Sequence, residues 1–101
     1  MNLSVERRKD TNEVVIRLPA QFDFKVHREF RCAYSEPAAA GACYVVDLRN
    51  TQYLDSSALG MLLQLREHAG GDGRRVRLVN ANSAIMDILR IANFEKLMTI
   101  S

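Results

Sequence analysis

Two adjacent hydroxyl side chains, Ser56 and Ser57, follow Asp55 where a strand-like segment gives way to an apolar run. Either serine could carry a phosphate, because the first backbone N–H groups of a helix lack partners within the helix and favour an oxyanion. The same residues are also common helix caps, and Asp55 or Ser56 could cap this one. Taken alone, Asp55, Ser56 and Ser57 fit either a phosphorylation site or an ordinary helix start.

The segments flanking the serines predict a buried strand and then a helix. Residues 43–48 form a nearly continuous apolar run, which is typical of a central strand. From residue 56 to about 69, Leu59, Leu62, Leu63 and Arg66 recur at helical spacing. The glycine-rich run at 70–73 predicts the end of that helix; it lacks the Lys-Ser/Thr pair of a phosphate-binding loop.

The remaining elements complete an alternating pattern. Residues 4–8 and 13–18 predict a hairpin around a turn at 10–12, and residues 75–79 predict another strand. One helix should begin after the Phe22-Asp23 turn and end before Pro37, and another should begin at Asn82 or Ser83. The predicted buried faces consist of Val26, Phe30, Ala33 and Tyr34 in the first, and of Ile85, Ile88, Leu89 and Ala92 in the second, with Phe94 and Leu97 packing beyond it.

Strand-helix-strand alternation over residues 45–79 favours parallel pairing through right-handed crossovers. We therefore expect an α/β fold with a mixed β-sheet and helices packed on it. A chain of 101 residues, 48% hydrophobic, suits one domain over residues 1–101.

The charge pattern gives little support for a nucleic-acid or membrane partner. The formal net charge is +2, and the densest basic group, Arg74, Arg75 and Arg77, alternates with apolar residues as on a solvated strand face. No apolar run approaches the roughly 20 residues that span a bilayer, and the N-terminus lacks a secretory hydrophobic region. We expect a cytoplasmic protein without membrane insertion.

Cysteine and histidine spacing indicates neither a metal site nor a catalytic site. Cys32 and Cys43 lie in apolar surroundings outside any metal-binding motif, so we expect reduced core residues. His27 and His68 are far apart in sequence and are expected at the surface. No cofactor, metal or enzymatic activity is predicted.

Two motifs in order make the sequence resemble STAS domains, specifically bacterial anti-sigma-factor antagonists. The first is Arg17-Leu18-Pro19-Ala20-Gln21-Phe22-Asp23, similar to a strand-to-helix segment of that family. The second is Val46-Asp47-Leu48 followed by Leu54-Asp55-Ser56-Ser57-Ala58-Leu59-Gly60, which resembles the family's phosphoacceptor signature. Ala20 and Ala58 stand where the family usually has glycine. Because alanine adopts a positive φ far less readily than glycine, Ala20 raises the question of whether the turn at residue 20 has a positive φ.

The resemblance implies a partner-switching regulator and not an enzyme. In that family the unphosphorylated antagonist binds an anti-sigma factor, a GHKL-type serine kinase switches it off, and a PP2C-type phosphatase restores it. The implied acceptor is Ser56, with Ser57 as the alternative. The implied partner surface consists of Phe22, Asp23, Asp55, Ser56, Ser57, Gly60 and Met61.

A second hypothesis treats the chain as a constitutive STAS subunit of a larger complex, such as a transporter assembly, without phosphorylation. Loss of both serine hydroxyls should then have little effect. The sequence names neither the partner nor the oligomeric state.

Overall fold

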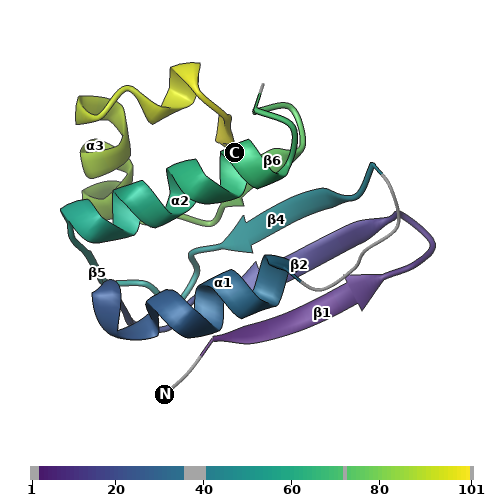
Figure 1. Ribbon diagram of the computed structural model, residues 1–101. Helices are drawn as coiled ribbons and strands as arrows, with labels where there is room; N and C mark the ends of the chain where they lie inside the picture. The colour runs from purple at the N-terminus through teal and green to yellow at the C-terminus, as the bar shows by residue number, and fades with distance from the viewer. Residues whose placement is uncertain (1–2, 36–40, 72, 101) are drawn as a thin grey trace.

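A five-stranded mixed sheet forms the framework of the chain (Figure 1). The computed structural model describes residues 3–35, 41–71 and 73–100. In spatial order the strands are β1 (Ser4–Arg8), β2 (Glu13–Arg17), β4 (Cys43–Asp47), β6 (Val76–Val79) and β7 (Thr99–Ile100). The β1–β2 hairpin is antiparallel and every other neighbouring pair is parallel, which confirms the predicted α/β class and mixed sheet.

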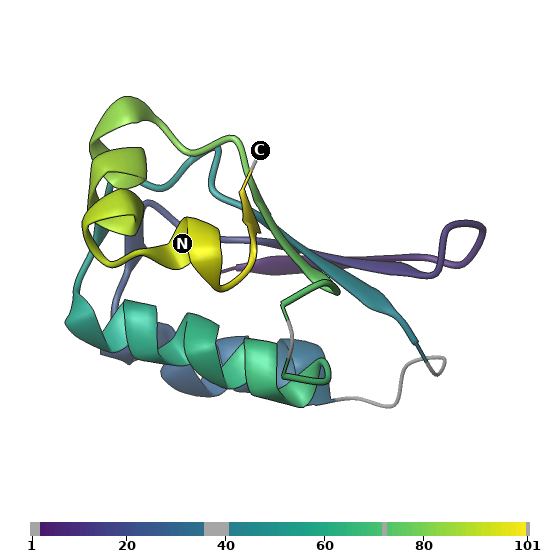
Figure 2. The same cartoon turned by 90° about the horizontal axis from the view of Figure 1, so that it is seen from above.

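Helices follow the parallel strands as crossover connections. They are η1 (Phe24–Val26) leading into α1 (His27–Ser35), α2 (Ser56–His68), and α3 (Ser83–Ile91) followed by η2 (Phe94–Lys96). Figure 2 shows α1 and α2 together on one side of the sheet. The predicted helix stripes are confirmed at Phe30, Tyr34, Ile85 and Leu89, all of which are buried. No helix in the described ranges is long and apolar enough to cross a membrane.

The buried face of α2 differs from the predicted stripe. Ala58, Met61, Leu62 and Leu65 form it, whereas Leu63 is 36% exposed. Leu59 and Arg66 are only partly buried. Both sets of positions have helical spacing, and apolar residues surround much of this helix, so periodicity alone did not fix its rotation.

Ion pairs cover the sheet face opposite α1 and α2. Val15 and Val45 are adjacent in register and buried, but they lie outside the main core cluster. Arg17 Nη2 lies 2.7 Å from Glu6 Oε1, and Arg17 Nε lies 3.9 Å from Asp47 Oδ2. These ion-paired side chains shield Val15 and Val45 from solvent on this face of the sheet.

The cysteine prediction was wrong, because Cys32 and Cys43 are both exposed. Cys32 lies on the outer side of α1, off the buried stripe, and Cys43 opens β4 immediately before buried Tyr44. Both thiols are free. His68 is exposed as predicted, with its ring 5.0 Å from that of Tyr34, and His27 is partly exposed.

Buried Thr51 joins three loops at the carboxyl ends of the parallel strands. Its hydroxyl donates to the Pro19 carbonyl at 3.0 Å, and its own carbonyl accepts from Asn82 Nδ2 at 3.2 Å. Asn82 also caps α3 by accepting from the Ile85 N–H at 2.9 Å. The loop that leads to Ser56 is thus fixed to the loops after β2 and β6.

Gly73 allows the C-terminal segment to pack against the loop after α2. Its φ is +78°, and a Cβ there would collide with the Leu97 carbonyl oxygen. Arg66 Nε donates to that same carbonyl at 2.7 Å. A side chain at position 73 is excluded by both backbone conformation and space.

Replacing Gly73 with alanine should lower the free energy of unfolding by roughly 3 kcal/mol, because overpacking adds to φ strain. Gly60→Ala is the matched control: it lies in α2 with no atom near its Cβ position, so helix propensity should raise stability by about 0.5–1 kcal/mol. Urea unfolding of both variants measures this. A stable Gly73→Ala protein would contradict the proposed close approach.

Thr51→Val should cost about 1–2 kcal/mol of unfolding free energy, because the shape is kept while the buried Pro19 carbonyl loses its donor. Thr99→Val, at an exposed strand position, should change stability by less than about 0.5 kcal/mol. Chemical denaturation, analysed with the same m-value for both variants, measures the two free energies of unfolding. Equal stability of the two variants would show that the Thr51 hydroxyl contributes nothing.

Candidate functional site

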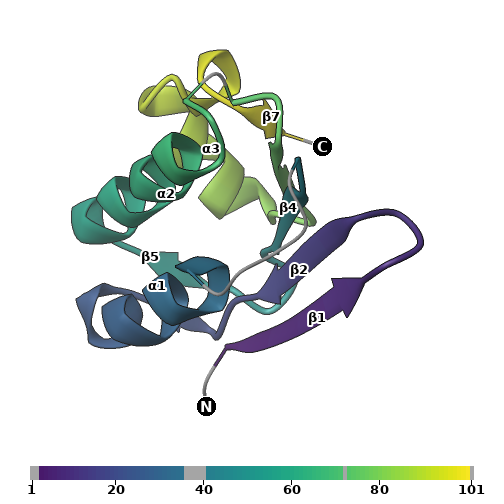
Figure 3. The same ribbon diagram turned by 45° about the vertical axis from the view of Figure 1, so that its right-hand side comes forward.

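A short parallel pairing brings the two sequence motifs side by side. In β3 (Gln21–Phe22) and β5 (Tyr53–Leu54), Gln21 pairs with Tyr53 and Phe22 pairs with Leu54. The backbone N–H groups of Gln52 and Tyr53 both donate to the Ala20 carbonyl, at 2.8 and 3.1 Å. Asp23 and Asp55 are the next residues along the two strands, so the two acidic helix caps lie at the same edge. Figure 3 shows α1 and α2 with their N-terminal ends on the same side of the molecule.

Asp55 is the N-cap of α2. Its Oδ1 accepts from Ser57 Oγ at 2.6 Å and from the Ala58 N–H at 2.9 Å. These hydrogen bonds, the one from Ser57 first, hold the pKa of Asp55 below its ordinary value of 3.8. The start of α2 therefore already interacts with one anionic side chain before any phosphate is added.

The two serines have different environments. Ser56 is exposed and makes no side-chain hydrogen bond within the described residues. Ser57 is half-buried, and its hydroxyl proton points to Asp55. A modifying enzyme would find Ser56 accessible, whereas reaching Ser57 would require breaking its bond to Asp55.

Asp23 has a similar capping role at the neighbouring helix start. Its Oδ1 accepts from the Lys25 N–H at 2.9 Å and caps η1. The side chain is half-buried. Asp23 thus lies at the same edge as Ser56.

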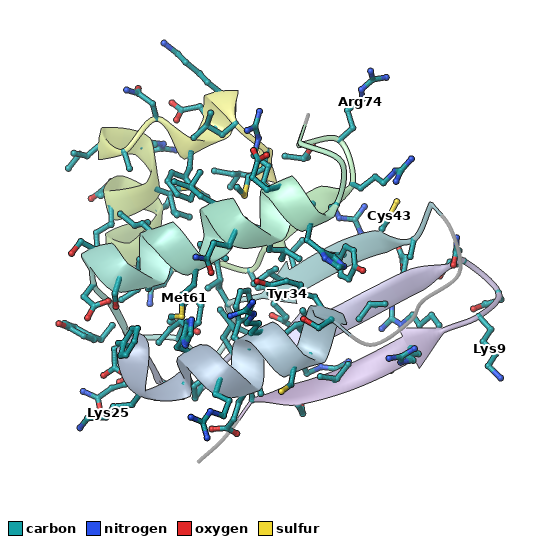
Figure 4. The ribbon with its side chains drawn as sticks, viewed as in Figure 1. Lys9, Lys25, Tyr34, Cys43, Met61 and Arg74 are labelled. Atoms are coloured by element: carbon teal, nitrogen blue, oxygen red, sulfur yellow. The ribbon has the colours of Figure 1, made fainter. Side chains whose placement is uncertain are left out.

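The structure places two of the predicted partner-binding residues in the core, which corrects the expectation that their side chains face a partner. Phe22 is fully buried, with its ring 5.1 Å from that of Phe30. Met61 is 4% exposed, and Figure 4 shows its side chain between α1 and α2. Its position on the α2 wheel, three residues after Ala58, aligns it with the buried face. Gly60 is exposed, as a contact residue must be.

Two exposed aromatic residues near this edge were missed. Phe24 is 65% exposed and stacks on His27, with ring centroids 4.9 Å apart, and Tyr53 is 48% exposed. Phe24 directly follows the cap Asp23 and lies off the Val26–Phe30 stripe, which is a sequence signal for an outward position. Tyr53 alternates with buried Leu54 along β5, which is the corresponding signal in a strand.

The two departures from the family glycines fit the structure. Ala20 is absent from the described residues that have a positive φ, so its turn does not require glycine. Ala58 is fully buried in the first turn of α2, where its methyl group packs in the core.

This edge presents an accessible hydroxyl at Ser56. No histidine or lysine hydrogen-bonds either serine among the described residues. The same residues contain no cluster of three metal-ligating side chains. Ser56 is therefore suited to be modified, and it lacks the general base that activates a serine nucleophile.

Ser57→Ala should raise the pKa of Asp55, because it removes the hydrogen bond that contributes most to lowering it. A carboxyl group with a lowered folded-state pKa contributes stability above its unfolded pKa and loses that contribution as pH falls through the folded pKa. In Ser57→Ala the folded-state pKa lies nearer the unfolded value, so the acid loss of stability from this carboxyl should be smaller and should be complete at a higher pH. NMR titration of the Asp55 carboxyl carbon measures the shift, with Ser56→Ala as the control that leaves the titration unchanged. An identical Asp55 titration in both variants would rule out the assigned hydrogen bond.

Sequence comparison identifies relatives across nearly the whole chain. A family model described as "Mlab, STAS domain" matches residues 5–99. A STAS-domain-containing protein of Pseudomonas aeruginosa is 51% identical over 92 residues, covering 91% of each chain. An anti-sigma F factor antagonist of Paenibacillus polymyxa is 26% identical over 102 residues, covering 99% of this chain and 87% of that protein.

Solved structures have the same fold. A STAS-domain protein of Planctomyces limnophilus superimposes with a TM-score of 0.82 at 16% identity, over 99% of this chain and 89% of the other. The Bacillus protein SpoIIAA in its phosphorylated form gives a TM-score of 0.66 at 17% identity, over 98% and 90%. Because the family model matches residues 5–99, nearly the whole chain, the chain belongs to the STAS-domain family.

Proposed function

We propose that this chain is an anti-sigma-factor antagonist whose unphosphorylated form binds an anti-sigma factor or a related GHKL-type kinase, and that phosphorylation of Ser56 switches it off. The observation that carries the proposal is the contrast between the serines: Ser56 is exposed at the start of α2, while Ser57 donates to Asp55. Homology to an anti-sigma F factor antagonist supports the general role.

Electrostatics gives the proposed switch its direction. A phosphoserine carries about −1.5 to −2 charges near neutral pH. At Ser56 it would lie next to the Asp55 carboxylate, which already accepts from the Ala58 N–H, and at the edge that also holds Asp23. The added charge and its hydration shell would oppose close docking of a partner on this edge.

The proposed partner surface is the exposed part of this edge. It comprises Asp23, Asp55, Ser56, Ser57 and Gly60, with Phe24 as an added aromatic contact. Phe22 and Met61 support it from the core. A partner would gain apolar contact from Phe24, since exposed aromatic side chains contribute strongly to interfaces.

Reversal requires removal of the phosphate, which we assign to a PP2C-type phosphatase, with a GHKL-type kinase as the enzyme that adds it. The chain is then a substrate and a ligand, not an enzyme. A constitutive STAS subunit without phosphorylation is the alternative outcome of the test below.

Ser56→Ala should keep partner binding and abolish modification, whereas Ser56→Asp should weaken binding at least about tenfold, or about 1.4 kcal/mol. Peptide mass spectrometry of the tryptic segment 50–66 from native cells measures the phosphate and its position. Calorimetry with the anti-sigma factor of the same genome measures affinity.

Ser83→Asp is the matched control for added charge. Ser83 follows the N-cap Asn82 of α3, as Ser56 follows Asp55, and it is also exposed. Its substitution should leave partner affinity unchanged. Phosphate on Ser57 alone would refute Ser56 as the acceptor and move the switch by one residue. Absence of phosphate across growth conditions, or equal binding by Ser56→Ala and Ser56→Asp, would refute the proposed switch and favour the constitutive subunit.

A further inference from the structure

The exposed face of α2 carries no charge over most of its length. Ser56 and Gly60 lie one helical turn apart on this face, and Leu63 and Gln64 follow one turn further on. The whole segment 56–65 contains no aspartate, glutamate, lysine or arginine. An uncharged surface thus begins at Ser56 and continues along the helix.

The other two α-helices have charged residues at their exposed positions. Arg28 and Arg31 are exposed on α1, and Asp87 and Arg90 are exposed on α3. A solvated helix face normally carries charged and polar residues, whereas the centre of a protein interface is depleted in charged residues. Figures 1 and 2 show no helix or strand over the outer side of α2. The face of α2 that contains Ser56 is therefore open and has the charge pattern of an interface centre.

No contact within the described chain requires glycine at position 60. The φ of Gly60 lies outside the left-handed region, and no described atom lies within 4 Å of the position that a Cβ would occupy. Gly73, by contrast, is required by both its φ and the nearby Leu97 carbonyl. Glycine destabilises a helix interior relative to alanine, because it loses more conformational entropy on folding. Gly60 therefore lowers the stability of α2 without an internal packing reason.

The absence of a side chain at Gly60 leaves the backbone of α2 accessible. Another element can approach the helix closely there, because the distance between packed elements depends on the side chains at the contact. Half-buried Leu59 and Leu63, which is 36% exposed, lie beside this point and offer apolar contact. Backbone groups in a helix interior are already hydrogen-bonded within the helix, so an added β-strand would find no partners on this face. An incoming helix needs none, and it fits this surface.

We infer that the partner of the unphosphorylated chain packs a helix across α2 at Gly60, with a large apolar side chain over the glycine and beside Leu63. The inference rests on the proposed function and adds the element and the chemistry of the partner. A phosphate on Ser56 would place its charge one turn from this contact, where segment 56–65 offers no cation to pair with it. A second copy of the chain fits less well, because pairing through this face would cover Ser56 and exclude its kinase.

Substitutions at Gly60 should have opposite effects on folding and on binding. Gly60→Ala should raise the urea midpoint of unfolding, because alanine favours the helix. The same methyl group should weaken binding to the anti-sigma factor about fivefold, and Gly60→Leu should weaken it about a hundredfold, because both overpack the contact. Calorimetry measures the affinities. A loss of affinity in a more stable protein cannot result from unfolding.

Ser83→Leu is the matched control for added bulk, because Ser83 is an exposed, uncharged residue on α3. It should leave the affinity unchanged. Far-UV circular dichroism and thermal melting establish that each variant is folded. Ser56→Asp in the same titrations tests the proposed switch separately from the contact at Gly60.

The outcomes separate the inference from the proposed function. Weakened binding by Ser56→Asp, together with unchanged binding by Gly60→Leu, would overturn the inference and leave the switch standing. An unsubstituted chain that sediments as a dimer, with Gly60→Leu as a monomer, would show that this face pairs two copies and would also overturn it. Absence of any binding by the unsubstituted chain would overturn the proposed function and the inference together.

Discussion

The pairing of two very short strands determines what this protein presents at its surface. Gln21 and Phe22 align with Tyr53 and Leu54, and the chain enters a helix directly after each pair. Parallel strands in register must end at the same level, so Asp23 and Asp55 become neighbouring helix caps although 31 residues separate them along the chain. The Thr51 hydroxyl donates to the Pro19 carbonyl, and this hydrogen bond joins the segment before β5 to the segment before β3. Without these contacts, the exposed serine would be one more polar residue at a helix start.

Sequence patterns predicted the main elements well, because apolar alternation and spacing arise from burial on one face. The hairpin, the buried strand at Val45 and Val46, and the stripe at Phe30 and Tyr34 follow from that rule. The rule was less informative for α2, where apolar side chains surround much of the helix and rotation depends on neighbouring elements. Met61 faces the core and Leu63 the solvent for this reason.

The candidate site was predictable in its residue types but not in its hydrogen bonds. Motif similarity placed Asp23, Asp55 and the two serines together, and the pairing of β3 with β5 provides the physical reason. The distinction between the serines depends on a single contact of 2.6 Å between Ser57 and Asp55, which no periodicity encodes. Similarly, Cys32 and Cys43 have apolar neighbours in sequence, but sequence neighbours along a helix or strand point in different directions.

The cap formed by Asp55 also bears on how long a phosphate would last. Many anion sites at helix starts hold their ligand tightly because the backbone N–H groups have no other acceptor. Here a carboxylate already accepts from the Ala58 N–H, so a phosphoryl group on Ser56 would have to compete with it and would stay largely hydrated. A hydrated phosphoester on an exposed residue is readily reached by a hydrolase. In the proposed switch, the acidic cap would favour a phosphate with a short lifetime, set by the proposed kinase and phosphatase and not by the fold.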